Sequence, residues 1–260
     1  MLRILNSPNP AARAMCEQLH QALDGHVHKF TRGVVFAIGG DGTMLRAIRD
    51  FWHDDPLFVG LSAGHLGFLQ AFEAEQISDV IAALTTTKPL TVSAPLLQVT
   101  AGDGQGLGYA FNDVSVERAG PRASRFTLDV NGSTGSFIGD GVIFATAFGS
   151  TAYSLAAGGP IIDTRSSDVF VVTPNNPHVS SQYSSLQRPH VLQRGRNVRI
   201  TIADDDAMER PTQLVLDGHT VDDQLSRPVT IGLSDKTISF LQLKHDSFHA
   251  RLEAKRLGRS

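Results

Sequence analysis

Residues 38–43, Ile-Gly-Gly-Asp-Gly-Thr, combine two features that suit phosphate chemistry. Glycines let backbone N–H groups approach a phosphate closely, and the helix expected from Thr43 would direct its N-terminus at an anion. A phosphate would repel the Asp41 carboxylate, so that carboxylate suits a base on a hydroxyl that is about to be phosphorylated. A plain strand-to-helix turn with Asp41 as helix cap explains the same residues about as well.

A second glycine-rich segment, residues 60–64 (Gly-Leu-Ser-Ala-Gly), matches the G-x-S-x-G pattern of a hydrolase nucleophile elbow. That elbow needs a helix directly after the serine. Gly67 follows within a few residues and weakens a helix start. We therefore interpret the segment as a glycine-rich substrate loop and expect no nucleophilic role for Ser62.

Two polar features lie farther along the chain. Asn112 and Asp113 interrupt a strand-like run, where both residue types are disfavoured, so they mark either a turn or a site. Residues 140–160 hold Asp140-Gly141, a short apolar strand and the run Gly-Ser-Thr-Ala-Tyr-Ser at 149–154. Glycines and small hydroxyl residues suit close packing against a sugar or phosphate, although a turn and a helix cap explain them almost as well.

Metal ligands and the common nucleotide motifs are poorly represented. The pairs His26/His28 and His245/His249 have spacings that a metal could use, but no third ligand is evident. Cys16 is the single cysteine, which excludes an intramolecular disulfide and fits a reducing compartment. The chain has no G-x-x-x-x-G-K-[ST] motif and no strand-turn-helix G-x-G-x-x-G motif, so the usual nucleotide folds are poorly supported.

The first ninety residues alternate between strand and helix patterns, as a parallel α/β unit does. Strands are expected at Leu2–Leu5, Val34–Ile38 and Leu57–Gly60, and helices at residues 11–23, 43–52 and 73–84. Together with the motifs above, this pattern predicts an N-terminal α/β domain over residues 1–90. A last helix, at about 247–260, could pack back on it.

From about residue 90 the pattern becomes all-β, with many short strand-like runs between turn signals that include Asn131-Gly132, Asn175-Asn176-Pro177 and Asp217-Gly218. The predicted β-rich domain covers residues 91–246. Its expected strands are Leu96–Thr100, Tyr109–Glu117, Phe126–Val130, Val142–Ala147, Val169–Thr173, Val198–Ile202, Thr212–Leu216 and Val229–Gly232.

Composition narrows the class of protein further. Of the 260 residues 41% are hydrophobic and 19% charged, which is globular composition and excludes a wholly disordered chain. The formal net charge of −3 gives no global basic footprint for nucleic acid or an acidic membrane. Residues 141–162 carry no charge, but their glycines and hydroxyl residues do not suit a membrane span. We expect a cytoplasmic protein with no nucleic-acid or membrane partner.

Taken in order, these motifs resemble the NAD kinase family over most of the chain. Residues 39–43 are similar to its Gly-Gly-Asp-Gly-Thr signature, and residues 64–69 to its second glycine loop. Asn112-Asp113 with Arg118 resembles its Asn-Glu motif, and residues 140–160 resemble its long central motif. Further matches are Thr173-Pro174, Pro177-His178, Ser247, Phe248, Leu252 and Lys255.

The resemblance implies a Rossmann-like α/β domain followed by a β-sandwich, with NAD bound between them. It also implies phosphoryl transfer from ATP, with Mg²⁺, to the 2′-hydroxyl of the adenosine ribose, with Asp41 as base. The implied phosphate loop is Gly39, Gly40, Gly42 and Thr43, and no metal ligand is implied. The implied NAD contacts are Asp41, Gly42, Phe68, Asn112, Asp113, Asp140, Phe148, Thr151, Ala152, Tyr153, Ser154, Leu155, Ala156 and His219.

Some positions depart from the family pattern. Ala147-Phe148 stands where Pro-Thr is usual, and Asp113 replaces a glutamate. Asn175-Asn176 alters a usually compact loop, and Ile138 holds a position that is often polar or basic and bears on NAD against NADH preference. A lipid kinase of the same superfamily and a non-catalytic dinucleotide sensor stay open as alternatives. The phosphoryl donor, feedback by NADP(H) and the choice between homodimer and homotetramer also stay open.

Overall fold

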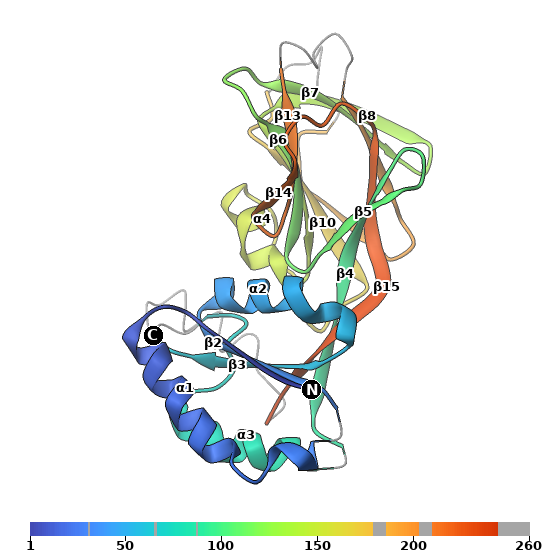
Figure 1. The fold of residues 1–260 in the computed structure, drawn as a ribbon. Coiled ribbons are helices and arrows are strands. Elements are labelled where there is room, and N and C mark those ends of the chain that lie inside the picture. Colours follow the sequence, from blue (N-terminus) through green and yellow to red (C-terminus); the bar gives the residue numbers. More distant parts are fainter. Residues whose placement is uncertain (31, 65–66, 87, 179–185, 203–209, 244–260) are drawn as a thin grey trace. The chain divides into compact units, whose positions relative to one another are not determined.

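The computed structural model describes all residues except 31, 65–66, 87, 179–185, 203–209 and 244–260, and the chain divides into two compact units (Figure 1). Unit 1 is Met1–Ser93 with the chain from Ile238, and unit 2 is Ala94–Thr237. The long strands β4 (Thr91–Ala101) and β15 (Val229–Leu241) contribute to both. The helix expected at about 247–260 lies outside the described residues.

Unit 1 is a parallel sheet with helices on both faces. Its strands run in the order β1-β2-β3-β15, and Ser239 and Phe240 of β15 pair in parallel with Leu57 and Phe58. Figure 1 draws α2 over one face and α1 and α3 over the other. The elements are β1 (Leu2–Asn6), α1 (Pro10–Leu23), β2 (Val34–Gly39), α2 (Asp41–Phe51), β3 (Leu57–Ser62) and α3 (Ile77–Leu84), with 3₁₀ turns at Val27–Lys29, Trp52–Asp54 and Ala74–Gln76.

Helix α1 forms where its sequence supplies both a start signal and an apolar stripe. The Asn9 side chain accepts a hydrogen bond from the Ala12 backbone N–H at 2.6 Å, and Pro10 occupies the first helical position. Buried side chains recur along one face of α1, and with α3 they pack on alternate residues of β2. The core on this face includes Ala12, Met15, Leu19, Leu23, Val34, Phe36, Ile38, Val80 and Ile81.

Unit 2 is an antiparallel β-sandwich. One sheet runs in the order β11-β10-β9-β6-β13-β14, and the other contains β12, β7, β8, β5 and the unit 2 parts of β4 and β15. Seven strands of the unit begin and end as β5 (Gly106–Ala110), β6 (Asp113–Arg118), β7 (Ser124–Val130), β8 (Ser133–Gly139), β9 (Gly141–Thr146), β10 (Val169–Asn175) and β11 (His190–Gln193). The remainder are β12 (Val198–Ile202), β13 (Thr212–Leu216), β14 (His219–Asp222), a 3₁₀ turn (Gly149–Thr151) and α4 (Tyr153–Ala156).

The predicted architecture, a Rossmann-like α/β domain and a β-sandwich domain, is confirmed. The expected strand Tyr109–Glu117 is wrong in one respect, because it breaks into β5 and β6 around Asn112. Strands β8, β11 and β14 were not predicted, because their sequences lack a clear apolar alternation, and β11 and β14 are also largely exposed. The β7–β8 turn does follow its Asn-Gly signal, with Asn131 and Gly132 both at positive φ.

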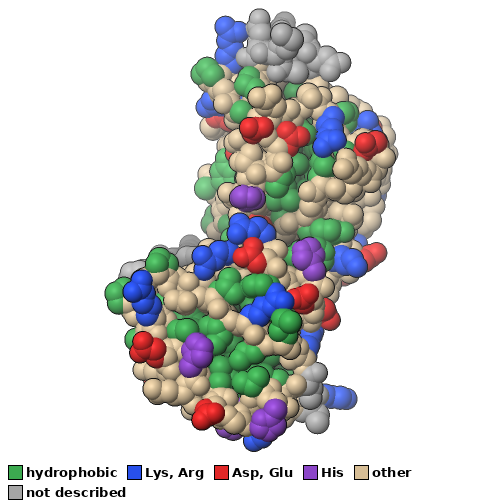
Figure 2. Space-filling view, viewed as in Figure 1, with side chains coloured by type: hydrophobic (Ala, Val, Ile, Leu, Met, Phe, Trp, Pro, Cys, Tyr) green, Lys and Arg blue, Asp and Glu red, His purple; other side chains and the backbone are tan. Residues whose placement is uncertain are grey.

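Surface charge is mixed on the face drawn in Figure 2, where acidic and basic side chains lie among one another. This distribution accompanies a formal net charge of −3. Within the described part of the chain, no helix has the length and apolar character needed to cross a membrane.

Candidate functional site: two loops that backbone hydrogen bonds hold

The glycine loop of unit 1 joins β2 to α2. Gly39 ends β2 at φ +152°, a conformation that other residues rarely adopt, and a Cβ there would lie 3.0 Å from Ser7 Cβ. Gly40 is the N-cap of α2, and its carbonyl accepts the Thr43 N–H at 2.9 Å. The helix therefore begins at Asp41, two residues earlier than predicted.

Asp41 does not cap the helix that it begins. Its two carboxylate oxygens accept backbone hydrogen bonds from Phe68 (3.0 Å, to Oδ2) and Leu69 (2.9 Å, to Oδ1). No side chain caps α2, so the interpretation of Asp41 as a simple helix cap is wrong. The carboxylate is instead fixed by the second glycine loop, whose residues His65 and Leu66 lie outside the described residues.

Two neighbours complete this clamp on Asp41. A Cβ at Gly67 would overlap the Asp41 carboxylate and lie 2.8 Å from its Cγ, so only glycine fits there without a shift. The fully buried Gln70 donates from Nε2 to the Gly40 carbonyl at 2.8 Å. The two glycine motifs of the sequence thus form one structure, which brings together Gly39, Gly40, Asp41, Gly42, Thr43 and Phe68.

Ser62 ends β3 beside this loop and is buried. Its hydroxyl donates to the Gly64 carbonyl at 3.3 Å. An activated nucleophile would instead be hydrogen-bonded to a side-chain base. That Ser62 has no nucleophilic role stays a prediction.

In unit 2, Asp217 fixes the backbone at the polar break between β5 and β6. Its carboxylate accepts N–H groups from Phe111 and Asn112, both at 2.7 Å, and from Asp113 at 3.1 Å. The Asp217 N–H in turn donates to the Asp113 carbonyl at 2.9 Å. The sequence identified Asp217-Gly218 only as a turn, because a contact across more than one hundred residues leaves no local pattern.

The same loop is held from β9. The Thr146 hydroxyl donates to the Phe111 carbonyl at 2.7 Å, and the Thr146 N–H donates to the Asn112 carbonyl at 2.9 Å. A Cβ at Gly149 would overlap that carbonyl, so this glycine permits the close approach. Asn112 is 9% exposed, and its Oδ1 has no hydrogen-bond partner among the described residues. A buried acceptor in this state suits a donor on a ligand.

Asp113 lies in an acidic setting. Its carboxyl is buried, and burial together with the negative charges of Asp217 and Glu117 raises its pKa to about 7. A carboxyl with such a pKa is partly protonated near neutral pH. Its ionised form accepts hydrogen bonds from donors, and its protonated form can also donate one. The ring of Phe148 packs on Phe111 with centroids 5.2 Å apart, beside this loop.

The segment after β9 forms a short surface helix with a polar interior. The Ser150 hydroxyl donates to the Ala147 carbonyl at 2.7 Å, and the buried Ser154 hydroxyl lies 2.8 Å from that of Thr173. Tyr153 and Leu155 are each 40% exposed, Ala156 is exposed, and Thr151 and Ala152 are half-buried. Ser154 therefore faces the interior, and its predicted contact with NAD stays a prediction.

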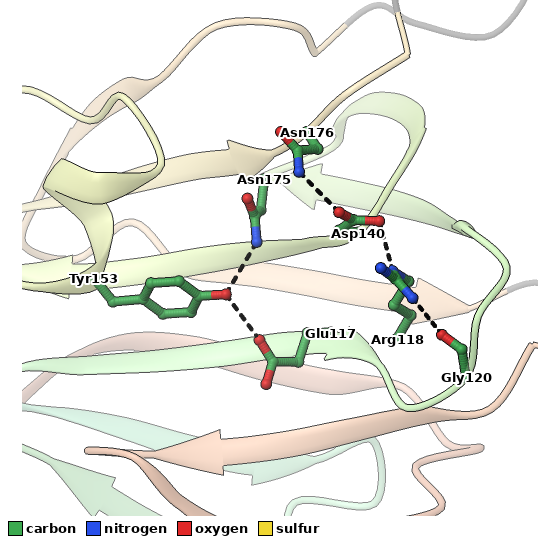
Figure 3. Close-up of polar contacts among 7 residues, drawn as sticks. All are labelled: Glu117, Arg118, Gly120, Asp140, Tyr153, Asn175 and Asn176. Atoms are coloured by element: carbon green, nitrogen blue, oxygen red, sulfur yellow. Dashed lines mark hydrogen bonds and ion pairs between the residues drawn. The ribbon is translucent and has the colours of Figure 1, made fainter.

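Two hydrogen-bonded chains link the ends of β6 and β10 (Figure 3). The Tyr153 hydroxyl donates to Glu117 Oε2 at 3.2 Å and accepts from Asn175 Nδ2 at 3.0 Å. Asp140 Oδ1 accepts from Arg118 Nε at 2.6 Å, and its Oδ2 accepts from Asn176 Nδ2 at 2.8 Å. Hydrogen bonds from Asn176 and Arg118 hold the pKa of Asp140 below its ordinary value, against the opposing effect of burial.

These contacts bring several of the predicted residues of unit 2 into one neighbourhood. Burial and the Glu117 charge raise the pKa of Tyr153, and the negative charge of Asp113 also contributes. His219 is exposed at the start of β14, two residues after Asp217. The residues that sequence reasoning missed are those that hold the others in place, namely Gln70, Glu117, Thr146, Asn175, Asn176 and Asp217.

Metal-binding groups and cavities lie apart from these loops or are not found in the described part of the chain. Among the described residues, no group of three or more His, Cys, Asp or Glu side chains could hold a metal ion. A cavity of about 840 Å³ lies between β7, β8, β10 and β11, and its mixed lining includes the apolar Leu128 and Val172 and the polar His190, Gln193 and Arg196. None of the predicted site residues lines this cavity.

Comparisons with known proteins agree with the motifs. A model of the ATP-NAD kinase N-terminal domain matches residues 7–88, and one of the ATP-NAD kinase C-terminal domain matches residues 111–243. An NAD kinase of Campylobacter jejuni is 32% identical over 230 residues, covering 85% of this chain and 75% of that protein. An NAD kinase of Methanospirillum hungatei is 34% identical over 189 residues, and the match spans 72% of this chain and 65% of that protein.

Two solved structures share the fold. Yeast NADH kinase complexed with NADH superposes with a TM-score of 0.81 at 20% identity, over 99% of this chain and 87% of that one. An NAD kinase from Archaeoglobus fulgidus in complex with ATP has a TM-score of 0.76 at 21% identity, over 98% and 97% of the two chains. Because the two family models together cover most of the chain, the chain belongs to the NAD kinase family.

Proposed function

We propose that this chain transfers the γ-phosphoryl group of ATP to the 2′-hydroxyl of the adenosine ribose of NAD, giving NADP and ADP. The observation that carries the proposal is Asp41, a carboxylate at the first position of α2 that two backbone N–H groups hold in one orientation. The curated names of the relatives support the same substrate.

Asp41 can act as a base while it stays clamped. Each carboxylate oxygen has two lone pairs and accepts one backbone N–H, so one lone pair on each oxygen remains available. In the proposed step the ribose hydroxyl gives its proton to Asp41 while its oxygen forms a bond to the γ-phosphorus. The bond between that phosphorus and the bridging oxygen breaks, and ADP leaves with the electron pair. Positioned proton transfer of this kind contributes about 10²–10⁴-fold to a rate.

The glycine loop would receive the phosphates of ATP. Gly40 and Gly42 are exposed, and a Cβ at either would meet nothing within 4 Å, so the backbone is open to a close approach. Mg²⁺ enters in this proposal with ATP, since Mg²⁺ is usually held by substrate phosphates and one or two carboxylates. The ion would neutralise charge on the transferring group.

The residues of unit 2 are assigned to the dinucleotide. Asn112 Oδ1 has no hydrogen-bond partner in the described part of the chain, and with the Asp113 carboxyl it suits the hydroxyl and amide donors of a nucleoside. Tyr153 offers an exposed ring for stacking, and Asp140 a fixed carboxylate. The cytoplasmic location expected from the composition belongs to the same proposal, as does the homodimer or homotetramer that the resemblance implies.

The test is an incubation of the full chain with Mg-ATP and NAD, with NADP measured by chromatography and ADP by a coupled assay. We expect NADP and ADP in equal amounts, and NADH in place of NAD shows whether the reduced form is accepted. NAD binding without NADP would indicate a sensor, and phosphorylation of diacylglycerol in vesicles instead of NAD would indicate a lipid kinase. Either of these results would overturn the proposal.

A further inference from the structure

Asn175 and Asn176, which depart from the family pattern, make the side-chain contacts on which two predicted dinucleotide residues depend (Figure 3). Asn176 Nδ2 donates to Asp140 Oδ2 at 2.8 Å, and Asn175 Nδ2 donates to the Tyr153 hydroxyl at 3.0 Å. Both asparagines sit at the end of β10, so one turn of backbone reaches both targets.

The backbone of this turn is itself fixed. The Asp140 N–H donates to the Asn175 carbonyl at 2.9 Å, and the His178 N–H donates to the Ile138 carbonyl at 2.7 Å. A Cβ at Gly139 would lie 2.8 Å from the Asn175 carbonyl oxygen, so glycine permits this contact. Asn176 has φ +47°, a left-handed conformation that asparagine tolerates better than most residues. Backbone hydrogen bonds therefore hold this turn against the junction of β8 and β9, where Asp140 lies.

The opposite sides of Tyr153 and Asp140 are held by β6. Glu117 accepts the Tyr153 hydroxyl at 3.2 Å, and Arg118 Nε donates to Asp140 at 2.6 Å. Each of the two side chains thus has one partner from β6 and one from the end of β10. Each Asp140 oxygen accepts one hydrogen bond, from Arg118 or from Asn176, and these two bonds fix the orientation of the carboxylate.

We propose that Asn175 and Asn176 are positioning residues that fix Tyr153 and Asp140 in the arrangement that receives the dinucleotide. The inference rests on the proposed function and deepens it, because it assigns the affinity of the unit 2 site partly to residues that contact no ligand. Ordering side chains before binding lowers the entropic cost of binding. The lowered pKa of Asp140 agrees, since the hydrogen bond from Asn176 is its first cause.

The first test compares Asn176→Gly with Asn131→Gly. Both residues adopt left-handed backbone, at φ +47° and +52°, so glycine keeps each turn while it removes the side chain. Asn131 lies in the β7–β8 turn and serves as the matched control. By calorimetry, Asn176→Gly should weaken NAD binding about tenfold, as loss of a hydrogen bond to a charged group does. Asn131→Gly should change it less than about twofold.

A pH series separates positioning from a general loss of structure. Asn176→Gly removes a hydrogen bond that lowers the pKa of Asp140, so that pKa should rise, with Arg118 and His178 as the remaining charged neighbours. As pH falls, NAD binding should therefore begin to weaken at a higher pH in Asn176→Gly than in the wild type. Asn176→Asp keeps the shape of the side chain but cannot donate to Asp140 at pH 7, so it should weaken NAD binding more than Asn176→Gly does. At lower pH, where the introduced carboxyl is protonated and can donate, NAD binding by this variant should partly recover.

Asn175 is tested through a double-mutant cycle with Tyr153→Phe. Asn175→Ala should weaken NAD binding about threefold to tenfold in the wild-type background and have little further effect once the tyrosine hydroxyl is absent. Equal NAD affinity in Asn176→Gly and Asn131→Gly, or additive effects in the Asn175 cycle, would overturn the inference. A wild-type chain that binds no NAD would overturn the proposed function, and the inference with it.

Discussion

Each unit of the molecule holds a carboxylate that accepts hydrogen bonds from consecutive backbone N–H groups, yet the proposed function gives the two carboxylates different tasks. In unit 1, Asp41 accepts from Phe68 and Leu69. In unit 2, Asp217 accepts from Phe111, Asn112 and Asp113. The hydrogen bonding is the same in both units. In the proposed function, the carboxylate acts on the substrate in unit 1, whereas the loop contacts it in unit 2.

In the proposed function, the unit 1 carboxylate is the functional group, and the second glycine loop holds it in place. The proposal reverses this arrangement in unit 2, where the Asp217 carboxylate holds the loop and the loop carries Asn112 and Asp113 as the binding groups. The second arrangement has an electrostatic consequence, because the Asp217 charge contributes to raising the pKa of Asp113 to about 7. A backbone clamp can thus fix a charge for catalysis or fix a loop for binding, and only the surroundings distinguish the two uses.

The largest effect is expected from Asp41→Asn. An amide cannot take the ribose proton, so kcat should fall about 10²–10⁴-fold. Stability should also fall by about 1–3 kcal/mol, because the new NH₂ group faces a backbone N–H of Phe68 or Leu69. NAD affinity should stay within about tenfold, since loss of the charge relieves repulsion from phosphate. Steady-state kinetics gives kcat and calorimetry gives NAD affinity on the same preparation. A near-normal kcat would show that Asp41 is not the base.

Gly67→Ala tests the clamp while it leaves the carboxylate in the chain. The added Cβ overlaps the Asp41 carboxylate, and a displacement of about 1 Å in a reacting group can cost about 10²-fold in rate. We expect kcat to fall about that much, with a smaller change in KM for NAD. Gly106→Ala in β5 is the control, because a Cβ there meets nothing within 4 Å. Equal kcat in the two variants would show that the clamp does not set the rate.

Asp217→Asn should act on binding. One of the two oxygens becomes an NH₂ group, which cannot accept from the loop N–H groups. NAD affinity should fall about tenfold, and kcat at saturating NAD should stay within about threefold. The pKa of Asp113 should also fall, because a neighbouring negative charge is removed. An unchanged affinity in a folded variant would argue against Asp217 as the holder of the loop.

Asp113→Asn should change how stability depends on pH. With a folded-state pKa of about 7, the Asp113 carboxyl binds a proton more tightly in the folded chain than in the unfolded chain. The stability that this proton contributes is therefore present at acid pH and is lost as pH rises toward 7. The difference in free energy of unfolding between variant and wild type should grow in favour of the variant from about pH 4 to 7. Urea unfolding at several pH values measures it, and parallel curves would contradict the assignment.

Local sequence patterns were enough to predict some of this molecule. The apolar periodicity and the Gly-Gly-Asp-Gly turn located β2 and α2, and the polar pair Asn112-Asp113 was recognised as a turn or a site, although the strand around it was predicted as continuous. These features are local, because a few neighbouring residues determine them.

The residues that hold other side chains and loops in place could not be predicted from such patterns. Asp217 contacts residues more than one hundred positions away, and Asn176 reaches Asp140 across 36 positions. Strand register decides which side chains meet, and nothing near Asp217-Gly218 or Asn175-Asn176 encodes that register. The sequence therefore indicates only turns at both pairs. The contacts that these residues make with distant parts of the chain appear only in the structure.

Single-turnover NADP formation and NAD affinity, measured together on Asp41→Asn and Asp217→Asn, test the central claim most directly. The account predicts a crossover, in which Asp41→Asn loses rate and keeps affinity while Asp217→Asn loses affinity and keeps most of its rate at saturation. If both variants lost rate and affinity in the same proportion, the two carboxylates would have one role, and the division between a catalytic and a positioning clamp would be wrong.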